Sequence, residues 1–119
     1  MSWILDVPLV PVSQNSKDWR QWWTKHEITQ EWARAVFVLA KEAKIPALNG
    51  AELEALIYFP DRRRRDLDNF FAPLWKGAQD GLVDAGVFPD DNSAVVRPGV
   101  PTFALDKAYP HTEITIIPR

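Results

Sequence analysis

The sequence predicts an α+β fold: a single domain over residues 1–119, with a mixed β-sheet and two main helices packed on it in the order β-α-β-α-β-β. Two amphipathic helical segments alternate with short apolar segments of strand character, which is the pattern of a sheet covered by helices. The chain has 119 residues, of which 46% are hydrophobic and 12% aromatic. That composition supplies one hydrophobic core, and a second domain would be too small.

The first two strands are predicted from apolar residues that end at proline. Residues 3–7 are mostly apolar and are closed by Pro8 and Pro11, which limits the length of the strand. In residues 52–59, apolar and mostly polar positions alternate, and Pro60 follows. A period of two predicts a half-buried strand. Its inward side is Leu53, Ala55, Ile57 and Phe59.

Between these strands, residues 12–28 mix basic and aromatic side chains without a regular period, which predicts a loop with at most one helical turn. We expect at least two of its three tryptophans, Trp19, Trp22 and Trp23, to be mainly structural, because large aromatic side chains are buried on average. The alternative is that basic side chains contact phosphate while the rings stack on an unpaired base. The polar and basic residues are better candidates for DNA contacts than the rings. They are Asn15, Lys17, Arg20 and Lys25.

A helix is predicted over residues 30–44. Thr29 precedes it as an N-cap, and Pro46 follows its end. Apolar residues recur at spacings of three and four, which places them on one face of a helix. They are Ile28, Trp32, Val36, Leu39 and Ala43.

Four consecutive arginines, Arg62, Arg63, Arg64 and Arg65, follow the second strand. An exposed loop at the end of a strand is where a basic cluster can meet phosphate. The alternative is a solvated turn in which one or two arginines pair with Asp61, Asp66 or a neighbouring chain. The residues that follow favour the functional interpretation, because seven Asp or Asn residues lie within 26 positions. They are Asp66, Asp68, Asn69, Asp80, Asp84, Asp90 and Asp91.

Asp66 and Asp68 are two positions apart, so in an extended segment their carboxylates lie on the same side. They are then close enough to share a hard cation such as Mg²⁺. The alternative is that Asp68 only caps the next helix.

We expect that next helix to begin near Pro73, because proline is tolerated in the first turn and not in a helix interior. Residues 68–72 then form a separate turn or a kinked lead-in, and Lys76 and Asp80 lie on the polar side. Gly86 ends the helix with a left-handed cap. The return through residues 87–91 is expected to bring a third carboxylate towards the first two.

The stretches FPDRRRRDLDN, LVDAGVFPDD and AVV resemble the signature of the RusA family of Holliday-junction resolvases, and PVSQNSKDW and ITQEW resemble it more loosely. The resemblance covers most of the chain and is specific over residues 59–96. It implies a RusA-like fold in which Asp66, Asp68 and Asp91 bind Mg²⁺, with Mn²⁺ as a substitute. Asp90 and Asp80 are second choices for the metal, Lys76 is placed near the scissile phosphate, and Asn69 orients its neighbours. One departure is a stretch of about four extra residues, including Pro73, before Lys76.

The implied activity is that of a crossover junction endodeoxyribonuclease: Mg²⁺-dependent, structure-selective cleavage that resolves Holliday junctions by paired symmetric cuts. The implied partners are a four-way DNA junction and a second copy of the chain in a homodimer, and the implied process is DNA recombination or repair. Two alternatives remain open. One is a nuclease that acts on flaps or other branched DNA, and the other is a noncatalytic junction-binding protein on the same scaffold.

Charge is unevenly distributed along the chain. The net charge is −2, which argues against a protein that coats nucleic acid nonspecifically. Residues 66–91, however, contain one basic and six acidic side chains. Two bound divalent cations would offset most of this local negative charge. The metal-bound protein would then repel a polyanion such as DNA less than the metal-free protein does.

The remaining features limit the setting of the protein. Cysteine is absent, which excludes disulfides and thiolate metal sites. No apolar run approaches the length of a membrane span, and the N-terminus lacks the features of a signal peptide. We therefore expect no membrane partner and a cytoplasmic location in a bacterial or phage-infected cell.

The C-terminal part predicts two further strands, over residues 94–97 and 113–117, separated by a proline- and glycine-containing segment. His111, beside Pro110, is expected to be an ordinary surface residue and not a metal ligand. His26 is a slightly better candidate, because its loop can border the site.

Overall fold

The centre of the fold is β2 (Ala51–Phe59), in which buried residues alternate with more exposed ones as the sequence predicts. β2 pairs antiparallel with β5 (His111–Pro118), and β5 pairs antiparallel with β1 (Trp3–Val7). On its other edge, β2 pairs in parallel with β3 (Val96–Pro98) at its start and with β4 (Thr102–Leu105) at its end. The result is a mixed sheet of five strands. The computed structural model describes residues 1–90, 92 and 95–119.

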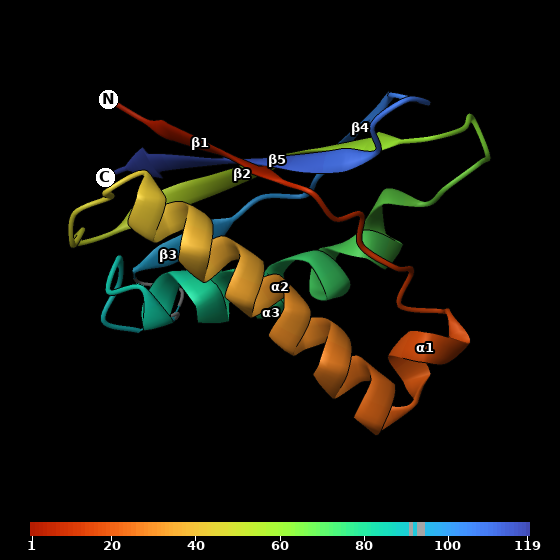
Figure 1. The fold of residues 1–119 in the computed structure, drawn as a ribbon, viewed down its shortest axis with the longest axis horizontal. Coiled ribbons are helices and arrows are strands. Elements are labelled where there is room, and N and C mark those ends of the chain that lie inside the picture. The colour runs from red at the N-terminus through yellow and green to blue at the C-terminus, as the bar shows by residue number, and fades with distance from the viewer. Residues whose placement is uncertain (91, 93–94) are drawn as a thin grey trace.

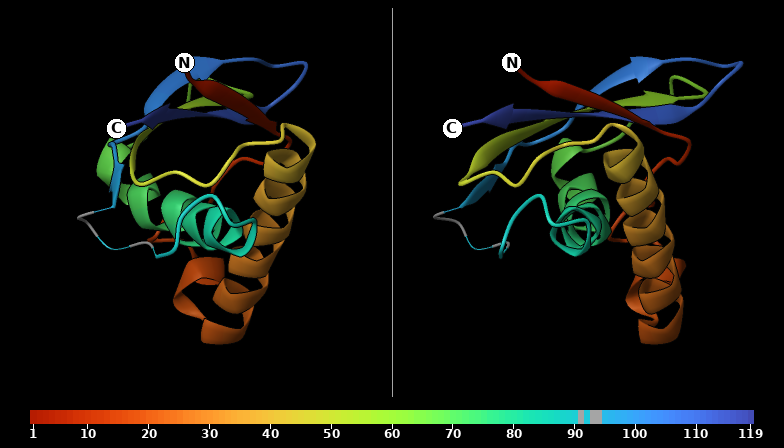
Figure 2. Two further views of the ribbon diagram at one scale, coloured as in Figure 1. Left: turned by 90° about the vertical axis from the view of Figure 1, so that its left-hand side faces the viewer. Right: turned by 60° about the vertical axis from the view of Figure 1, so that its left-hand side comes forward.

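Helices lie on one face of this sheet (Figures 1 and 2). The two long ones are α2 (Trp22–Glu42) and α3 (Phe71–Asp84), and a four-residue helix, α1 (Lys17–Arg20), precedes α2. A single apolar cluster joins the helices to the sheet, which confirms one α+β domain with a mixed sheet and two main helices. Its most buried members include Trp32, Val36, Leu74 and Leu82 from the helices and Leu53, Ile57, Ile114 and Ile116 from the strands.

Two glycines on α3 allow the two long helices to cross at close range. A Cβ atom on Gly77 would lie 2.5 Å from the carbonyl oxygen of Thr29, and one on Gly81 would lie 2.5 Å from that of Ala33. Both distances are too short for any real side chain. Because the glycines are four residues apart, they lie on the same face of α3, which packs against the backbone of α2.

The N-terminal half of α2 corrects the prediction of a loop. The helix begins at Trp22, eight residues before the predicted start, and only α1 matches the single helical turn expected in that segment. Thr29 is not an N-cap: it is buried within the helix, and its hydroxyl donates to the carbonyl oxygen of Lys25 at 2.8 Å. The helix begins earlier than predicted because its N-terminal half packs against α1 and α3. The spacing of apolar residues within the segment does not reveal these contacts.

The expectation that two of the three nearby tryptophans would be structural is wrong. Trp19 is buried, but the side chains of Trp22 and Trp23 are 73% and 54% exposed. They are the first two residues of α2, at the end that projects from the domain (Figure 1).

The start and end of α3 agree with the prediction. A 3-10 turn, η1 (Leu67–Phe70), forms the expected lead-in, and Pro73 lies in the first turn of α3, where its missing N–H has no helical acceptor to lose. At the other end, Gly86 has a positive φ of 81°, which fits the predicted left-handed cap.

The C-terminal segment contains one more strand than predicted. β3 and β5 correspond to the two expected strands, whereas β4 was not predicted, because it is short and only partly buried. His111 is buried and not an ordinary surface residue: its ring stacks on Tyr58 at 4.3 Å and on Tyr109 at 4.4 Å between centroids. Among the described residues, none of the helices has the length and apolar character needed to cross a membrane.

Candidate functional site

The arginine–aspartate turn, residues 61–69, leaves the end of β2 and is folded around one carboxylate. Asp61 accepts hydrogen bonds from the backbone N–H of Arg63 at 3.0 Å and from the Arg65 guanidinium at 2.8 Å. The backbone N–H of Arg63, followed by the Arg65 side chain, lowers the pKa of Asp61 below its ordinary value. The alternative interpretation, a turn in which one or two arginines pair with Asp61, therefore holds for this part of the segment.

Arg65 differs from the other arginines because the turn itself uses its guanidinium. It also donates to the carbonyl oxygens of Asp61 and Arg63, at 3.1 and 3.0 Å, and lies 3.9 Å from the centre of the Phe59 ring. Its side chain is only 13% exposed, against 77% for that of Arg63. Arg62 and Arg64 are exposed and make no ion pair with the described residues. Arg65 fixes the turn, and Arg62 and Arg64 are the arginines best placed to meet a phosphate.

Asp66 and Asp68 are both exposed and line one hollow with Arg64, Arg65, Leu67 and Asn69. Asp66, and not Asp68, caps the following turn, because its carboxylate accepts from the backbone N–H of Asp68 at 3.3 Å. The Asp68 carboxylate is thus not used as the cap of this helical segment. Carboxylate oxygens at the surface of such a hollow are suitable ligands for a hard cation such as Mg²⁺.

The N-terminal loop contacts this turn through Asn69. The backbone N–H of Gln14 donates to the Asn69 carbonyl oxygen at 2.8 Å, and the Gln14 amide donates to the Asn69 side-chain oxygen at 3.3 Å. The neighbouring Asn15, Lys17 and Arg20 are exposed. The predicted DNA contacts from the loop and from the turn therefore lie on adjoining parts of the surface.

A second hollow, the α2–α3 crevice, lies between the two long helices and has a volume of about 650 Å³. Lys76 is exposed and belongs to this crevice; it does not line either hollow that contains Asp66. The crevice is lined by Trp22, Lys25, His26, Thr29, Gln30 and Ala33 on α2, by Lys76, Asp80, Val83 and Asp84 on α3, and by Pro89 and Asp90.

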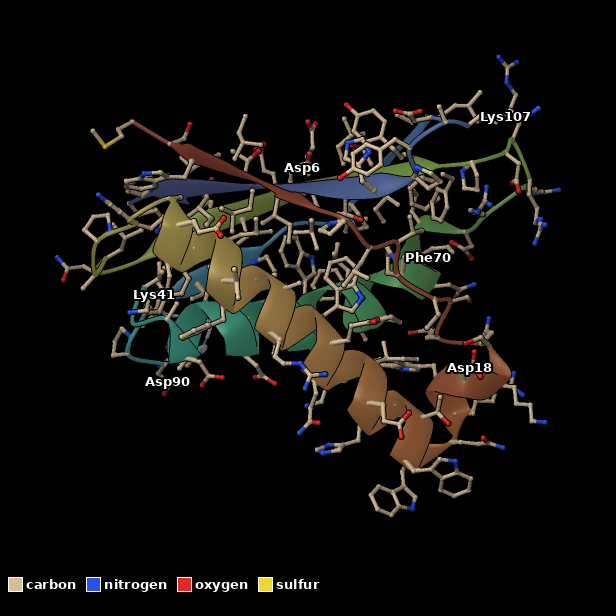
Figure 3. All side chains as sticks on the ribbon, viewed as in Figure 1. Asp6, Asp18, Lys41, Phe70, Asp90 and Lys107 are labelled. Atoms are coloured by element: carbon tan, nitrogen blue, oxygen red, sulfur yellow. The ribbon has the colours of Figure 1, made fainter. Side chains whose placement is uncertain are left out.

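The two groups of predicted metal ligands lie at opposite ends of α3. Figure 3 labels Phe70, two residues after Asp68, at the start of the helix and Asp90 beyond its end. The 14 residues of α3 rise by about 21 Å. The return after Gly86 therefore does not bring Asp90 towards Asp66 and Asp68. The predicted ligand Asp91 lies outside the described residues, and within those residues no three His, Asp or Glu side chains form a group that could hold a metal.

Sequence reasoning ranked the tryptophans at the start of α2 below the neighbouring basic residues as functional candidates. Trp22 lines the crevice, and the rings of Trp22 and Trp23 meet edge to face with centroids 6.3 Å apart. Lys25, by contrast, lies with its Nζ 4.9 Å from the centre of the buried Trp19 ring. Two adjacent tryptophans beside basic residues were the available signal.

Comparison of the sequence with protein-family models and with curated proteins finds no match.

Proposed function

We propose that the protein is a Mg²⁺-dependent endodeoxyribonuclease that acts on branched DNA and resolves four-way junctions, as the resemblance of its DLDN and DD motifs to the RusA family implies. One observation carries the proposal. Two exposed carboxylates, Asp66 and Asp68, share a hollow with Arg64 at the end of a strand. Acceptors for a cation and a donor for phosphate are thus present in one place.

Asp66 and Asp68 would hold the cation, and Asn69, held by Gln14, would orient the edge of the hollow. Mg²⁺ bound there supplies polarisation of the phosphoryl oxygen and activation of water for hydrolysis. Arg62 and Arg64 would bind the DNA backbone on either side of the cut. Because Lys76 lies in the other hollow, the Lys76 of a second copy of the chain would offset the negative charge that develops on the phosphate.

A homodimer belongs to this proposal for a geometric reason. Two cuts of like polarity in one junction require two active sites related by a twofold axis. In addition, α3 keeps Lys76 and Asp90 in a different hollow from Asp66 and Asp68. A second copy of the chain would bring the two groups together without any change within either chain.

The test is incubation of the purified protein with a mobile four-way junction and Mg²⁺, followed by mapping of the cuts on each strand. Paired symmetric nicks are expected from the wild type. Asp68→Asn should still bind the junction but cleave at least about 100-fold more slowly, because a metal ligand is lost. Glu52→Gln, which makes the same chemical change on an exposed residue of β2, is the matched control and should cleave normally.

Two other results would replace the proposal. Cleavage of flaps or other branched substrates without paired nicks in the junction would assign a different structural preference. If the wild type binds junctions and cuts none of them with Mg²⁺ or Mn²⁺, the protein is a noncatalytic junction-binding protein.

A further inference from the structure

The start of α2 presents two large aromatic rings to solvent. Trp22 and Trp23 are among the most exposed large hydrophobic side chains of the described residues, at 73% and 54%, although tryptophan is usually buried. Their rings meet edge to face at an interplanar angle of 79°, so that their faces point in different directions. Trp22 also lines the α2–α3 crevice. An exposed ring that lines a crevice together with charged side chains is a surface on which a flat ligand can stack.

We propose that Trp22 stacks on an unpaired base of branched DNA, which lies at the entrance of the α2–α3 crevice. The inference rests on the proposed function only in taking DNA as the ligand. Stacking on an aromatic side chain accepts any base, because every base has a π-face. Unpaired bases occur where the strands of branched DNA separate, so a stacking site would favour such DNA over a continuous duplex.

The charges of the crevice fit a nucleotide. Lys25, His26 and Lys76 line it on both helices, and lysine ammonium groups bind phosphate as compact cations. Asp84 lines the same crevice on α3, and a carboxylate accepts hydrogen bonds from the amino groups of bases. Cations for the backbone and acceptors for a base edge thus lie beside one exposed ring.

The same charges argue against an apolar protein surface as the occupant. The buried centre of a protein–protein interface is depleted in charged residues. This crevice carries two lysines and three aspartates around a single large ring. A nucleotide brings its own phosphate and its own hydrogen-bonding edge, so it suits a crevice lined by charged side chains better than an apolar protein surface does.

The test uses a short duplex that contains a single unpaired 2-aminopurine and the same duplex fully paired, with Ca²⁺ in place of Mg²⁺ to prevent cleavage. The wild type should quench the fluorescence of the unpaired base by stacking. Trp22→Ala should abolish this quenching and raise the Kd for the bulged DNA by roughly 5- to 150-fold, the range for one stacked base. The Kd for the paired duplex should not change, because phosphate contacts remain.

Two further variants serve as controls. Trp22→Phe keeps a ring and should retain most of the quenching. Val38→Ala removes another exposed apolar side chain of α2, 50% exposed and outside the crevice, and should behave as the wild type. Equal losses of Trp22→Ala on both DNAs, or undiminished quenching, would overturn the proposal. A change in the mass of the free protein with Trp22→Ala would instead make this surface an interface between copies.

Failure of this inference and failure of the proposed function give different results. If the wild type cuts junctions, and Trp22→Ala prefers the bulged DNA over the paired duplex as strongly as the wild type does, only the stacking proposal is rejected. If the wild type cuts no DNA, and Trp22→Ala nevertheless loses the preference for the unpaired base, the stacking site is supported and the nuclease activity is rejected.

Discussion

The two ends of α3 carry the two candidate sites of this protein, and they are built in different ways. The arginine–aspartate turn is one continuous segment, whose shape depends on contacts over two to four residues around Asp61. The α2–α3 crevice combines side chains from residues 22–33, 76–84 and 89–90. Chemistry that lies in a continuous segment is visible in a sequence, whereas chemistry assembled from distant segments requires the fold.

The largest effect is expected from an experiment that asks whether the two ends act together across a dimer. Asp68→Asn and Asp91→Asn should each be inactive in cleavage. Mixing the two proteins under conditions that exchange subunits should restore junction nicking to about a quarter of the wild-type rate, because about half of the dimers would be mixed and each would have one intact site. The physical reason is the length of α3, which separates Asp90, the neighbour of Asp91, from Asp68.

Mapping the nicks in the mixed sample sharpens this result, since each mixed dimer should cut one strand only. Mixing Asp66→Asn with Asp68→Asn is the control, because both changes affect the same end and no intact site can form. Absence of recovery in the first mixture would mean that the two ends belong to separate sites or that Asp91 acts within its own chain.

The crevice alone should respond to a change at the crossing of the helices. Gly77→Ala places a Cβ atom 2.5 Å from the Thr29 carbonyl oxygen and 2.6 Å from the Trp32 Cβ atom. We expect the free energy of unfolding to fall by about 1–3 kcal/mol, because overpacking outweighs the better helix propensity of alanine. Urea unfolding measures this loss.

Glu31→Ala, on an exposed position of α2, is the matched control and should change the stability by less than about 0.5 kcal/mol. The bulged-DNA preference should weaken with Gly77→Ala, while Mg²⁺ binding at the arginine–aspartate turn stays as in the wild type. A stable Gly77→Ala protein would show that α2 and α3 can separate without cost, which contradicts the close crossing.

Local signals account for the parts of the fold that the sequence predicted. The alternation in β2, the proline in the first turn of α3 and the glycine after its end each depend on a few neighbouring residues. The start of α2 could not be predicted in this way, because Thr29 and Ala33 are covered by glycines of α3 that lie 48 residues further along the chain. The spacing of Gly77 and Gly81 was the one indication of a close helix crossing.

In the candidate site, too, the features that depend on neighbouring residues could be predicted, and those that depend on the fold could not. Arg62, Arg64, Asp66 and Asp68 could be proposed from the sequence because their exposure follows from a turn after a strand. The separation of Lys76 from Asp66 could not, since it depends on the path of α3 between two hollows. The exposure of Trp22 also depends on its position at the end of a helix, and average tryptophan burial gave the wrong expectation.

The smallest effects are expected from variants that separate the DNA-binding role of Arg64 from the structural role of Arg65 in the arginine–aspartate turn. Arg64→Ala should weaken binding to all DNAs alike and reduce the slope of log K against log salt by about 0.9, as expected for the loss of one phosphate contact. Its stability should be unchanged. Arg65→Ala should lose about 0.5–1 kcal/mol of stability, because the guanidinium leaves the Phe59 ring. Urea unfolding and salt-dependent binding of the two variants compare these roles directly.

The pH dependence of stability separates the same two arginines. The pKa of Asp61 is lower in the folded protein than in the unfolded chain. Its ionised carboxylate therefore stabilises the fold above the unfolded-state pKa of about 4, and this stabilisation is lost as the pH falls through the folded-state pKa. Arg65→Ala removes one of the groups that lower this pKa, so its stability should fall less between pH 6 and pH 3, by roughly the part due to that one carboxylate. Arg64→Ala should keep the wild-type dependence, since Arg64 makes no ion pair with Asp61. An identical acid response in both variants would show that the backbone N–H of Arg63, and not the Arg65 guanidinium, lowers the pKa of Asp61.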